Sequence, residues 1–263
     1  MVASYSCYHI CGSYQRIIKI PHSGGVMVVS PNQGRLTTVS LAGVAVFGAL
    51  SAILTYLSQF LGLNFPLVPY LQFDLGEVAI VLSLFIFGPV PALVSSSVEF
   101  VTLMAIGQNA PVGPLLKLFA MTSTIAGIWM GIGFASRVRR ASMRSVFGLG
   151  TAFGAAVRAA VLTLPNYYLL VFLYTIPTIV GLLSGAFQLV GITLTDGNAL
   201  ALVLGFTAVF NVLQLLLVMA VSFAVLKVPQ VNGLKIAGRG LWVMAVTQEA
   251  TPGPRIQVNR AGG

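Results

Sequence analysis

The chain contains very few charged residues. Only 7% of its 263 residues are Asp, Glu, Lys or Arg, whereas 57% are apolar, and its mean hydropathy is +0.95. Soluble domains carry about 25% charged residues, so this composition excludes an ordinary soluble domain and predicts an integral membrane protein. The formal charge of +9 is therefore better explained by basic loops at a lipid bilayer surface than by binding to nucleic acid.

Cysteine, histidine and lysine are scarce in ways that exclude several functions. Cys7 and Cys11 are too few for a disulfide framework, and with His9 and His22 they match no standard zinc spacing. Because both histidines lie near the amino end, the apolar part lacks the His needed for an intramembrane metalloenzyme or Ser-His protease. None of the four lysines stands in a Gly-Lys-Ser/Thr context, which excludes a P-loop ATPase. We expect no metal site, no resident cofactor and no enzymatic activity.

Six apolar runs predict six transmembrane helices. The second run is short and ends at Gly88-Pro89. A further apolar segment, residues 176–194, contains Pro177 and several glycines, which favour an outer helical or re-entrant lid between helices five and six over a seventh crossing. The predicted fold is thus an all-α integral membrane protein with an outer lid. The six runs are residues 36–61, 75–87, 90–106, 112–135, 146–174 and 200–226.

The distribution of basic residues predicts the topology. Twelve of the 14 Lys and Arg residues fall in the amino-terminal region, in the loop at 137–144 or after residue 226. The expected outer segments at 62–73, 107–111 and 175–198 contain none. By the positive-inside rule both termini are cytoplasmic, and we expect a multi-pass protein of the cell membrane.

Three regions follow from these patterns. Residues 1–35 are expected to form a loose basic extension, with Met27 as an alternative start. Residues 36–227 are expected to form a six-helix transmembrane domain, and residues 228–263 a polar, disordered cytoplasmic tail.

Charged residues inside apolar runs are costly in a bilayer and usually functional. Asp74 and Glu77 open the second run, where they either cap a helix or contribute to a site. Lys117 either extends outward or lines the same site. Arg158 lies midway along the fifth run and requires a carboxylate or a polar cavity, with Glu99 or a lipid headgroup as candidate partners.

Three carboxamides accompany these charges. Asn166 follows Pro165 in the fifth run, and Asn211 and Gln214 share one face of the sixth run at i, i+3 spacing. Such amides either bond neighbouring helices or bind a small molecule. Their common position near the outer ends favours a binding site open to the exterior.

Several motifs together resemble a known family. The segment from Tyr70 to Pro89 contains Asp74 and Glu77 and ends in Phe-Gly-Pro. The segment Asn166-Tyr167-Tyr168 and the segment Phe210-Asn211-Val-Leu-Gln214 follow in later runs. These motifs resemble the substrate-binding S-components of energy-coupling-factor vitamin transporters, riboflavin-specific type, over roughly residues 36–227. Two positions differ, because Gln214 stands where that type has Lys and Lys117 stands where it has Asn.

The resemblance implies the function and the partners. It implies capture of riboflavin or a related flavin from outside, for uptake driven by a transmembrane coupling subunit and two ATPase subunits. The two differing positions leave open another flat heteroaromatic vitamin or a purine-like precursor. A membrane structural or assembly protein, whose amides only join helices, is the alternative from another class.

The resemblance also implies the residues that contact ligand and partner. By it Asp74, Asn166 and Asn211 take ligand-contact positions. A flat flavin ring suits stacking on Tyr167, Tyr168 and Phe210, carboxamides suit its pyrimidine edge, and Gln214 and Asp74 suit its ribityl hydroxyls. Lys117 completes the expected site. The small residues expected to dock the coupling subunit form two small-xxx-small pairs. The first pair is Gly48 and Ala52, and the second is Ala45 and Ala49.

Overall fold

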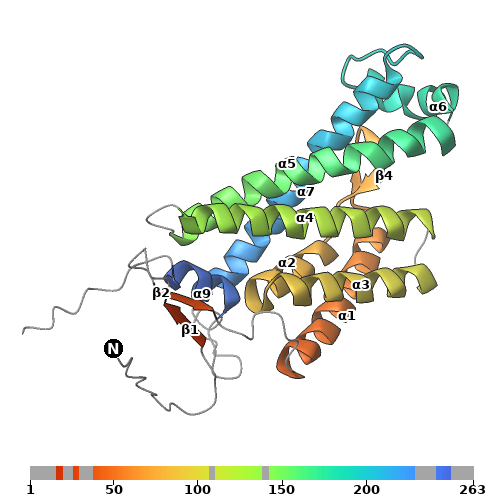
Figure 1. Ribbon diagram of the computed structural model, residues 1–263. Helices are drawn as coiled ribbons and strands as arrows, with labels where there is room; N and C mark the ends of the chain where they lie inside the picture. The colour runs from red at the N-terminus through yellow and green to blue at the C-terminus, as the bar shows by residue number, and fades with distance from the viewer. Residues whose placement is uncertain are drawn as a thin grey trace, which may run out of the picture. The chain divides into compact units, whose positions relative to one another are not determined.

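The computed structural model describes residues 16–19, 26–29, 38–106, 110–137, 142–173, 175–228 and 241–249. The five longest helices in this part of the chain are α1 (Thr38–Phe60), α3 (Pro89–Ile106), α4 (Val112–Arg137), α5 (Met143–Tyr168) and α7 (Ala199–Lys227) (Figure 1). The shorter elements are α2 (Gly76–Phe87), α6 (Ile176–Gln188), α9 (Trp242–Glu249), the π-helical turn η1 (Leu169–Leu173) and the strands β1 (Arg16–Lys19), β2 (Val26–Val29), β3 (Asn64–Phe65) and β4 (Val68–Gln72).

The five long helices, with η1 continuing α5, are long and apolar enough to cross a membrane. The protein is therefore an all-α membrane protein in its main part, as the composition predicts. Helix α2 has only 12 residues and at 1.5 Å per residue rises about 18 Å, well short of the roughly 30 Å hydrocarbon core. The prediction of exactly six crossings depends on α2 and stays a prediction.

The junction between α2 and α3 follows from the sequence Gly88-Pro89. Gly88 has φ 101°, a left-handed conformation that favours glycine, and its N–H donates to Leu84 O. Pro89 then opens α3 at a position where its missing N–H costs nothing. The chain thus reverses with no intervening loop, so α2 and α3 lie against each other.

The segment expected to form an outer lid contains helix α6. It has 13 residues and buries Ile179, Leu183 and Phe187, which recur every four residues on one face. This face packs with the start of α7 and with the β3–β4 hairpin. The segment thus forms a short amphipathic helix. It is not one of the helices long enough to cross a membrane, so the structure gives no support to a seventh crossing here.

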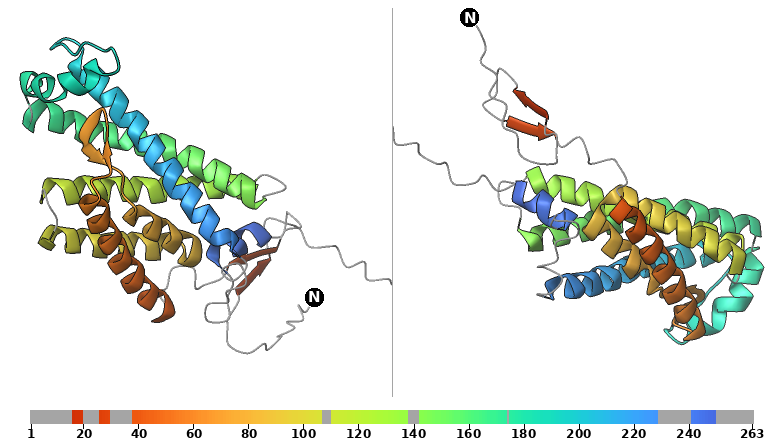
Figure 2. Two further views of the ribbon diagram at one scale, coloured as in Figure 1. Left: turned by 180° about the vertical axis from the view of Figure 1, so that it is seen from behind. Right: turned by 90° about the horizontal axis from the view of Figure 1, so that it is seen from below.

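Glycine allows α4 and α5 to pack unusually closely. A Cβ atom placed on Gly127 of α4 would lie 2.7 Å from the Cα of Gly154 of α5, and one on Gly131 would lie 2.7 Å from the Cα of Gly150. Two helices approach this closely only where small residues face each other. Figure 2 shows the consequence from behind, with α4 and α5 adjacent and α7 running obliquely beside α5.

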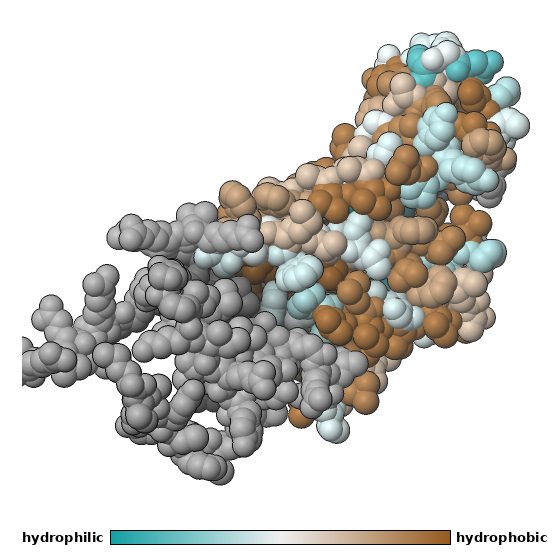
Figure 3. All heavy atoms as spheres, viewed as in Figure 1, coloured by the Kyte–Doolittle hydropathy of each residue, from teal (hydrophilic) through white to brown (hydrophobic). Residues whose placement is uncertain are grey.

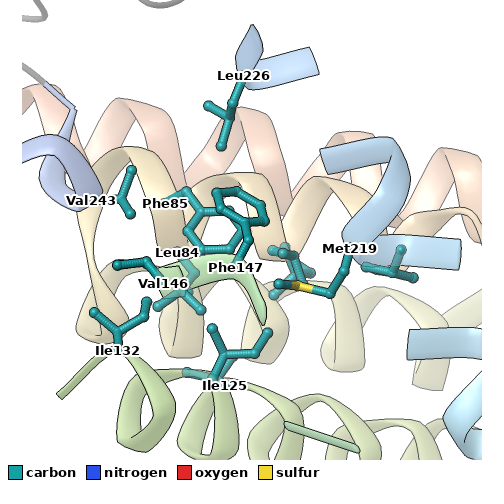
Figure 4. Close-up of a cluster of buried hydrophobic side chains, with 14 of the residues drawn as sticks. Leu84, Phe85, Ile125, Ile132, Val146, Phe147, Met219, Leu226 and Val243 are labelled. Carbon is teal, nitrogen blue, oxygen red and sulfur yellow. The ribbon is translucent and has the colours of Figure 1, made fainter. Parts of the chain in front are cut away.

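Two apolar clusters hold the bundle. The larger one centres on α2, where the ring of Phe85 packs tilted against that of Phe147 at a centroid distance of 4.6 Å, and it includes Met219 of α7 (Figure 4). The smaller one joins α6, the start of α7 and the hairpin around Phe65 and Phe187. On α7, Phe210 belongs to the smaller cluster and Leu215 to the larger, so the polar residues between them separate the two clusters.

Apolar side chains also cover the outside of the bundle. Figure 3 shows hydrophobic residues over α3, α4 and α5, whereas hydrophilic ones gather near the end that carries α6. Large exposed residues include Val101, Trp129 and Leu164. An apolar exterior of this extent is what lipid-facing helices require.

The two ends of the chain differ in part from the expected loose segments. Strands β1 and β2 pair antiparallel, with Arg16 opposite Val29, in a unit separate from residues 38–263. The prediction of a disordered tail is wrong for Trp242–Glu249, which forms α9. This helix is held because Leu241 and Val243 are buried in the larger cluster. The remaining residues of both segments lie outside the described residues.

Gly127→Ala is expected to destabilise the bundle by about 1–3 kcal/mol, because the added methyl meets the α5 backbone, which cannot move independently. Thermal unfolding in detergent measures the change. The matched control is Gly133→Ala on the same helix, where the added methyl has no atom within 4 Å and helix propensity favours Ala. Equal unfolding temperatures for the two variants would contradict the close α4–α5 contact.

Candidate functional site

Arg158 is the centre of a polar network inside the bundle. Its side chain is buried midway along α5 and forms a bidentate pair with Glu77 of α2, with Nη1–Oε2 and Nη2–Oε1 distances of 2.6 and 2.8 Å. Arg158 Nε also donates to Asn211 Oδ1 on α7, and Nη1 donates to Thr124 Oγ1 on α4, each at 3.1 Å. The carboxylate partner of Arg158 is therefore Glu77, and neither of the two candidates, Glu99 and a lipid headgroup, takes this place. One guanidinium joins α2, α4, α5 and α7.

Lys117 forms a second charged group with residues of three other segments. It pairs with Asp74, which precedes α2, and with Glu99 of α3 at 2.5 Å, and it also bonds Thr55 Oγ1 of α1. Ser51 Oγ donates to the same Glu99 oxygen at 2.5 Å. Lys117 thus points into the bundle rather than outward, because two carboxylates inside supply the charge that its ammonium needs.

Asp74 is fixed through both its side chain and its backbone. Its Oδ1 accepts hydrogen bonds from Thr55 Oγ1 at 2.9 Å and from the Gly76 N–H at 2.7 Å. Gln214 of α7 donates from Nε2 to Asp74 O at 2.7 Å and accepts the Asp74 N–H at 3.3 Å. An amide pairing with a backbone in this way reproduces one rung of a β-ladder, so Gln214 ties α7 to the start of α2.

A partly open cavity of about 230 Å³ lies beside this network. Its lining includes the aromatic residues Tyr70, Phe73 and Phe210, and the ring centroids of Phe73 and Phe210 lie 5.1 Å apart. Charged residues line it too, among them Asp74 and Lys117. A mostly apolar hollow with a few converging polar groups is the usual form of a small-molecule site. Its other polar lining residues are Thr55, Ser58, Gln59, Gln72, Glu77, Arg158, Asn166 and Asn211.

The three carboxamides have different roles. Asn166 lines the cavity and donates to Leu162 O, one turn earlier, at 2.8 Å. Asn211 lines it too, but both of its polar atoms are used, by Arg158 and by Thr207 O. Gln214 is buried and does not line the cavity. Of these three residues, Asn166 alone combines a cavity position with a free polar atom. Gln214, expected to contact the ligand, instead has a structural role.

Of the three aromatic residues expected to stack on a flat ligand, only Phe210 lines the cavity. Tyr167 and Tyr168 are 45% and 58% exposed, and neither lines the cavity. Tyr168 instead stacks on Phe172 at 4.5 Å. Consecutive helical residues point about 100° apart, so with Asn166 facing inward, both tyrosines turn to the outside. Phe210 keeps its expected place.

Several cavity residues lie outside the predicted site. Glu77 was expected only as a helix opener or a general site residue, and Thr55, Ser58 and Gln59 were not singled out. Their signal was present, because polar residues at 51, 55, 58 and 59 recur at helical spacing on one face of an otherwise apolar run. Tyr70 and Phe73 come from the hairpin, which no apolar period indicates.

The small residues of α1 divide between two faces. Gly48 and Ala52 are buried, and a Cβ atom on Gly48 would lie 2.9 Å from Val98 Cβ of α3. Ala45 and Ala49 are exposed. The first pair therefore packs within the bundle, and only the second pair remains available to a partner.

The cysteines and histidines named above lie outside the described residues. Among residues that are described, no group of three or more His, Cys, Asp or Glu side chains is arranged to hold a metal ion.

Comparison of the chain with family models, with curated proteins and with solved structures finds no match.

Replacing Glu77 by Leu is expected to lower the free energy of unfolding by about 3–5 kcal/mol, because it leaves Arg158 buried without its counter-charge. Thermal or denaturant unfolding in detergent measures this loss. The double variant Glu77→Leu/Arg158→Met should recover most of it, since no unpaired charge then remains. The control is Arg144→Met, at an exposed position of α5, the helix that carries Arg158. A double variant no more stable than Glu77→Leu would contradict this account.

Proposed function

We propose that this protein is the substrate-binding subunit of a membrane uptake system and that it captures riboflavin or a related flavin. The observation that carries the proposal is the cavity itself, whose lining combines the aromatic residues Tyr70, Phe73 and Phe210 with polar side chains inside one membrane bundle. A flat ring suits stacking on the aromatic residues, and its polar edge and hydroxyls suit hydrogen bonds to the polar ones.

The position of the cavity supports capture from outside. It is lined by residues of the β3–β4 hairpin, which belongs to the segment 62–73 that contains no Lys or Arg. By the positive-inside rule this end of the bundle faces the exterior, and both termini face the cytoplasm of a cell-membrane protein. Helix α6, packed against the same hairpin, serves as the outer lid.

The cavity is somewhat smaller than the sites of bound drug-sized molecules. Such sites enclose about 300–1,000 Å³, compared with about 230 Å³ here. A flavin therefore widens the cavity as it binds. The hairpin and α7 both contribute to its lining, and they meet through the aromatic contacts Phe65–Phe210 and Phe73–Phe210.

A second candidate function has an observation of its own. Asn211 and Gln214 are used within the bundle, as a membrane structural or assembly protein would use them. That function predicts no flavin binding. If the ligand is instead another flat vitamin or a purine-like precursor, that molecule binds in the same cavity and riboflavin does not bind.

Titration of riboflavin with micromolar detergent-solubilised protein is expected to quench flavin fluorescence. Asn166→Ala is expected to weaken binding by about 1–3 kcal/mol, because a buried edge of the ligand loses its partner. The matched control is Tyr167→Ala, the next residue in sequence, whose side chain is away from the cavity. Absence of quenching by the folded protein would refute flavin capture, and equal affinities of the two variants would refute this cavity.

Accumulation of a ligand requires energy from partners, which we propose are a transmembrane coupling subunit and two ATPases. The exposed pair on α1 is the proposed docking face, so Ala45→Trp and Ala49→Trp should abolish co-purification with the coupling subunit and uptake, but leave riboflavin affinity unchanged. Val101→Trp, at an exposed position of α3, is the control. Intact complexes with both α1 variants would exclude this face.

A further inference from the structure

The two cations beside the cavity have almost no hydrogen-bonding capacity left for a ligand. An ammonium group has three N–H donors, and Lys117 contacts three acceptors, on Asp74, Glu99 and Thr55. A guanidinium has five, and Arg158 makes four hydrogen bonds to protein, two of them to Glu77. An anionic ligand would have to break these pairs to reach either charge.

Backbone amides do not replace the missing donors. The amino end of a helix is often an anion site because its first N–H groups are free. At the start of α2, however, the Gly76 N–H donates to Asp74 Oδ1 at 2.7 Å and the Leu75 N–H donates to Ser58 Oγ at 3.0 Å. These two N–H groups are thus already satisfied.

The buried charges also sum to a negative value. The network contains three carboxylates, on Asp74, Glu77 and Glu99, and two cations, on Lys117 and Arg158. Its formal charge is therefore −1. Charges in a bundle of low polarity interact over several ångströms with little screening, so an anion entering the cavity is repelled.

Two carbonyl oxygens on residues that line the cavity remain free as acceptors. Gln59 Oε1 is buried and has no hydrogen-bond partner among the described residues, and Gln59 lines the cavity. Asn166 uses its nitrogen for Leu162 O, which leaves its carbonyl oxygen for a ligand. A buried acceptor without a partner is costly, and a ligand that donates N–H or O–H groups removes that cost.

From these observations we propose that the cavity selects by charge: it takes neutral or cationic ligands that donate hydrogen bonds, it rejects their phosphorylated forms, and Gln59 is a specificity-determining residue. The inference rests on the proposed function, because it concerns the same cavity. For flavins it means that riboflavin, with its imide N–H and ribityl hydroxyls, binds well. Riboflavin 5′-phosphate carries about −1.5 to −2 additional charge at pH 7 and binds poorly.

The first test compares riboflavin with riboflavin 5′-phosphate by fluorescence titration of the full-length protein in neutral detergent. We expect the phosphate to bind at least about tenfold more weakly. Asp74→Asn removes one negative charge and frees an ammonium donor of Lys117, so it should reduce the discrimination at least about fivefold. Asp196→Asn makes the same charge change at an exposed site before α7 and should leave the discrimination unchanged.

The second test concerns Gln59. Gln59→Leu is expected to weaken riboflavin binding about five- to tenfold, while the unfolding temperature stays the same or rises because an unsatisfied buried acceptor is gone. Gln188→Leu, at an exposed position of α6, is the control. A fall in unfolding temperature with unchanged affinity would show that Gln59 is only structural and would overturn its assigned role. This variant keeps the proposal testable if Asp74→Asn does not fold.

The outcomes separate this inference from the proposed function. Equal affinity for riboflavin and its phosphate overturns charge selection but leaves flavin capture standing. If riboflavin does not bind, flavin capture fails, and the same comparison with adenosine and AMP, and with pyridoxine and its phosphate, decides charge selection. Charge selection is overturned if a phosphorylated compound binds as tightly as its unphosphorylated parent. It is also overturned if no compound of any pair binds.

Discussion

The ion pair between Arg158 and Glu77 is the constraint on which the rest of the structure depends. A guanidinium in the middle of a membrane bundle is tolerated only with a counter-charge and with acceptors for its remaining N–H groups. Glu77, Thr124 and Asn211 supply these from three other helices. Because Glu77 lies in the first turn of α2, the pair also decides how deep this short helix sits. The apolar residues of α2 then form the centre of the larger cluster.

The second charged group extends this arrangement to the other half of the bundle. Lys117 brings together Asp74 and Glu99, and Ser51 and Thr55 of α1 complete their hydrogen bonds. Gln214 then links Asp74 back to α7. The two groups form a polar layer between two apolar clusters. The cavity lies beside this layer, and aromatic residues of the hairpin and of α7 also line it.

This layer gives the cavity its chemical character. Since its cations and carboxylates are satisfied by one another, they hold the helices in place and contribute repulsion more than affinity toward an anion. In the proposed function, the aromatic faces and the free carbonyl oxygens of Gln59 and Asn166 bind the ligand. The charged layer holds the helices together and, in the same proposal, determines which ligand charge the cavity accepts.

The sequence by itself determined the membrane class, the long helices and most of the polar residues at the cavity. Run length, scarce charge and helical spacing are local properties, and a polar residue in an apolar run is costly in a bilayer and usually functional. Asp74, Lys117, Asn166 and Asn211 stood out in this way, whereas Phe210 was expected from the family resemblance. Only the tertiary structure decided which charges pair, that Gln214 holds a backbone, that Tyr167 faces outward and that Tyr70 and Phe73 reach the cavity. These facts depend on the rotation and depth of each helix, and those are settled by contacts between residues as far apart in sequence as Asp74 and Gln214.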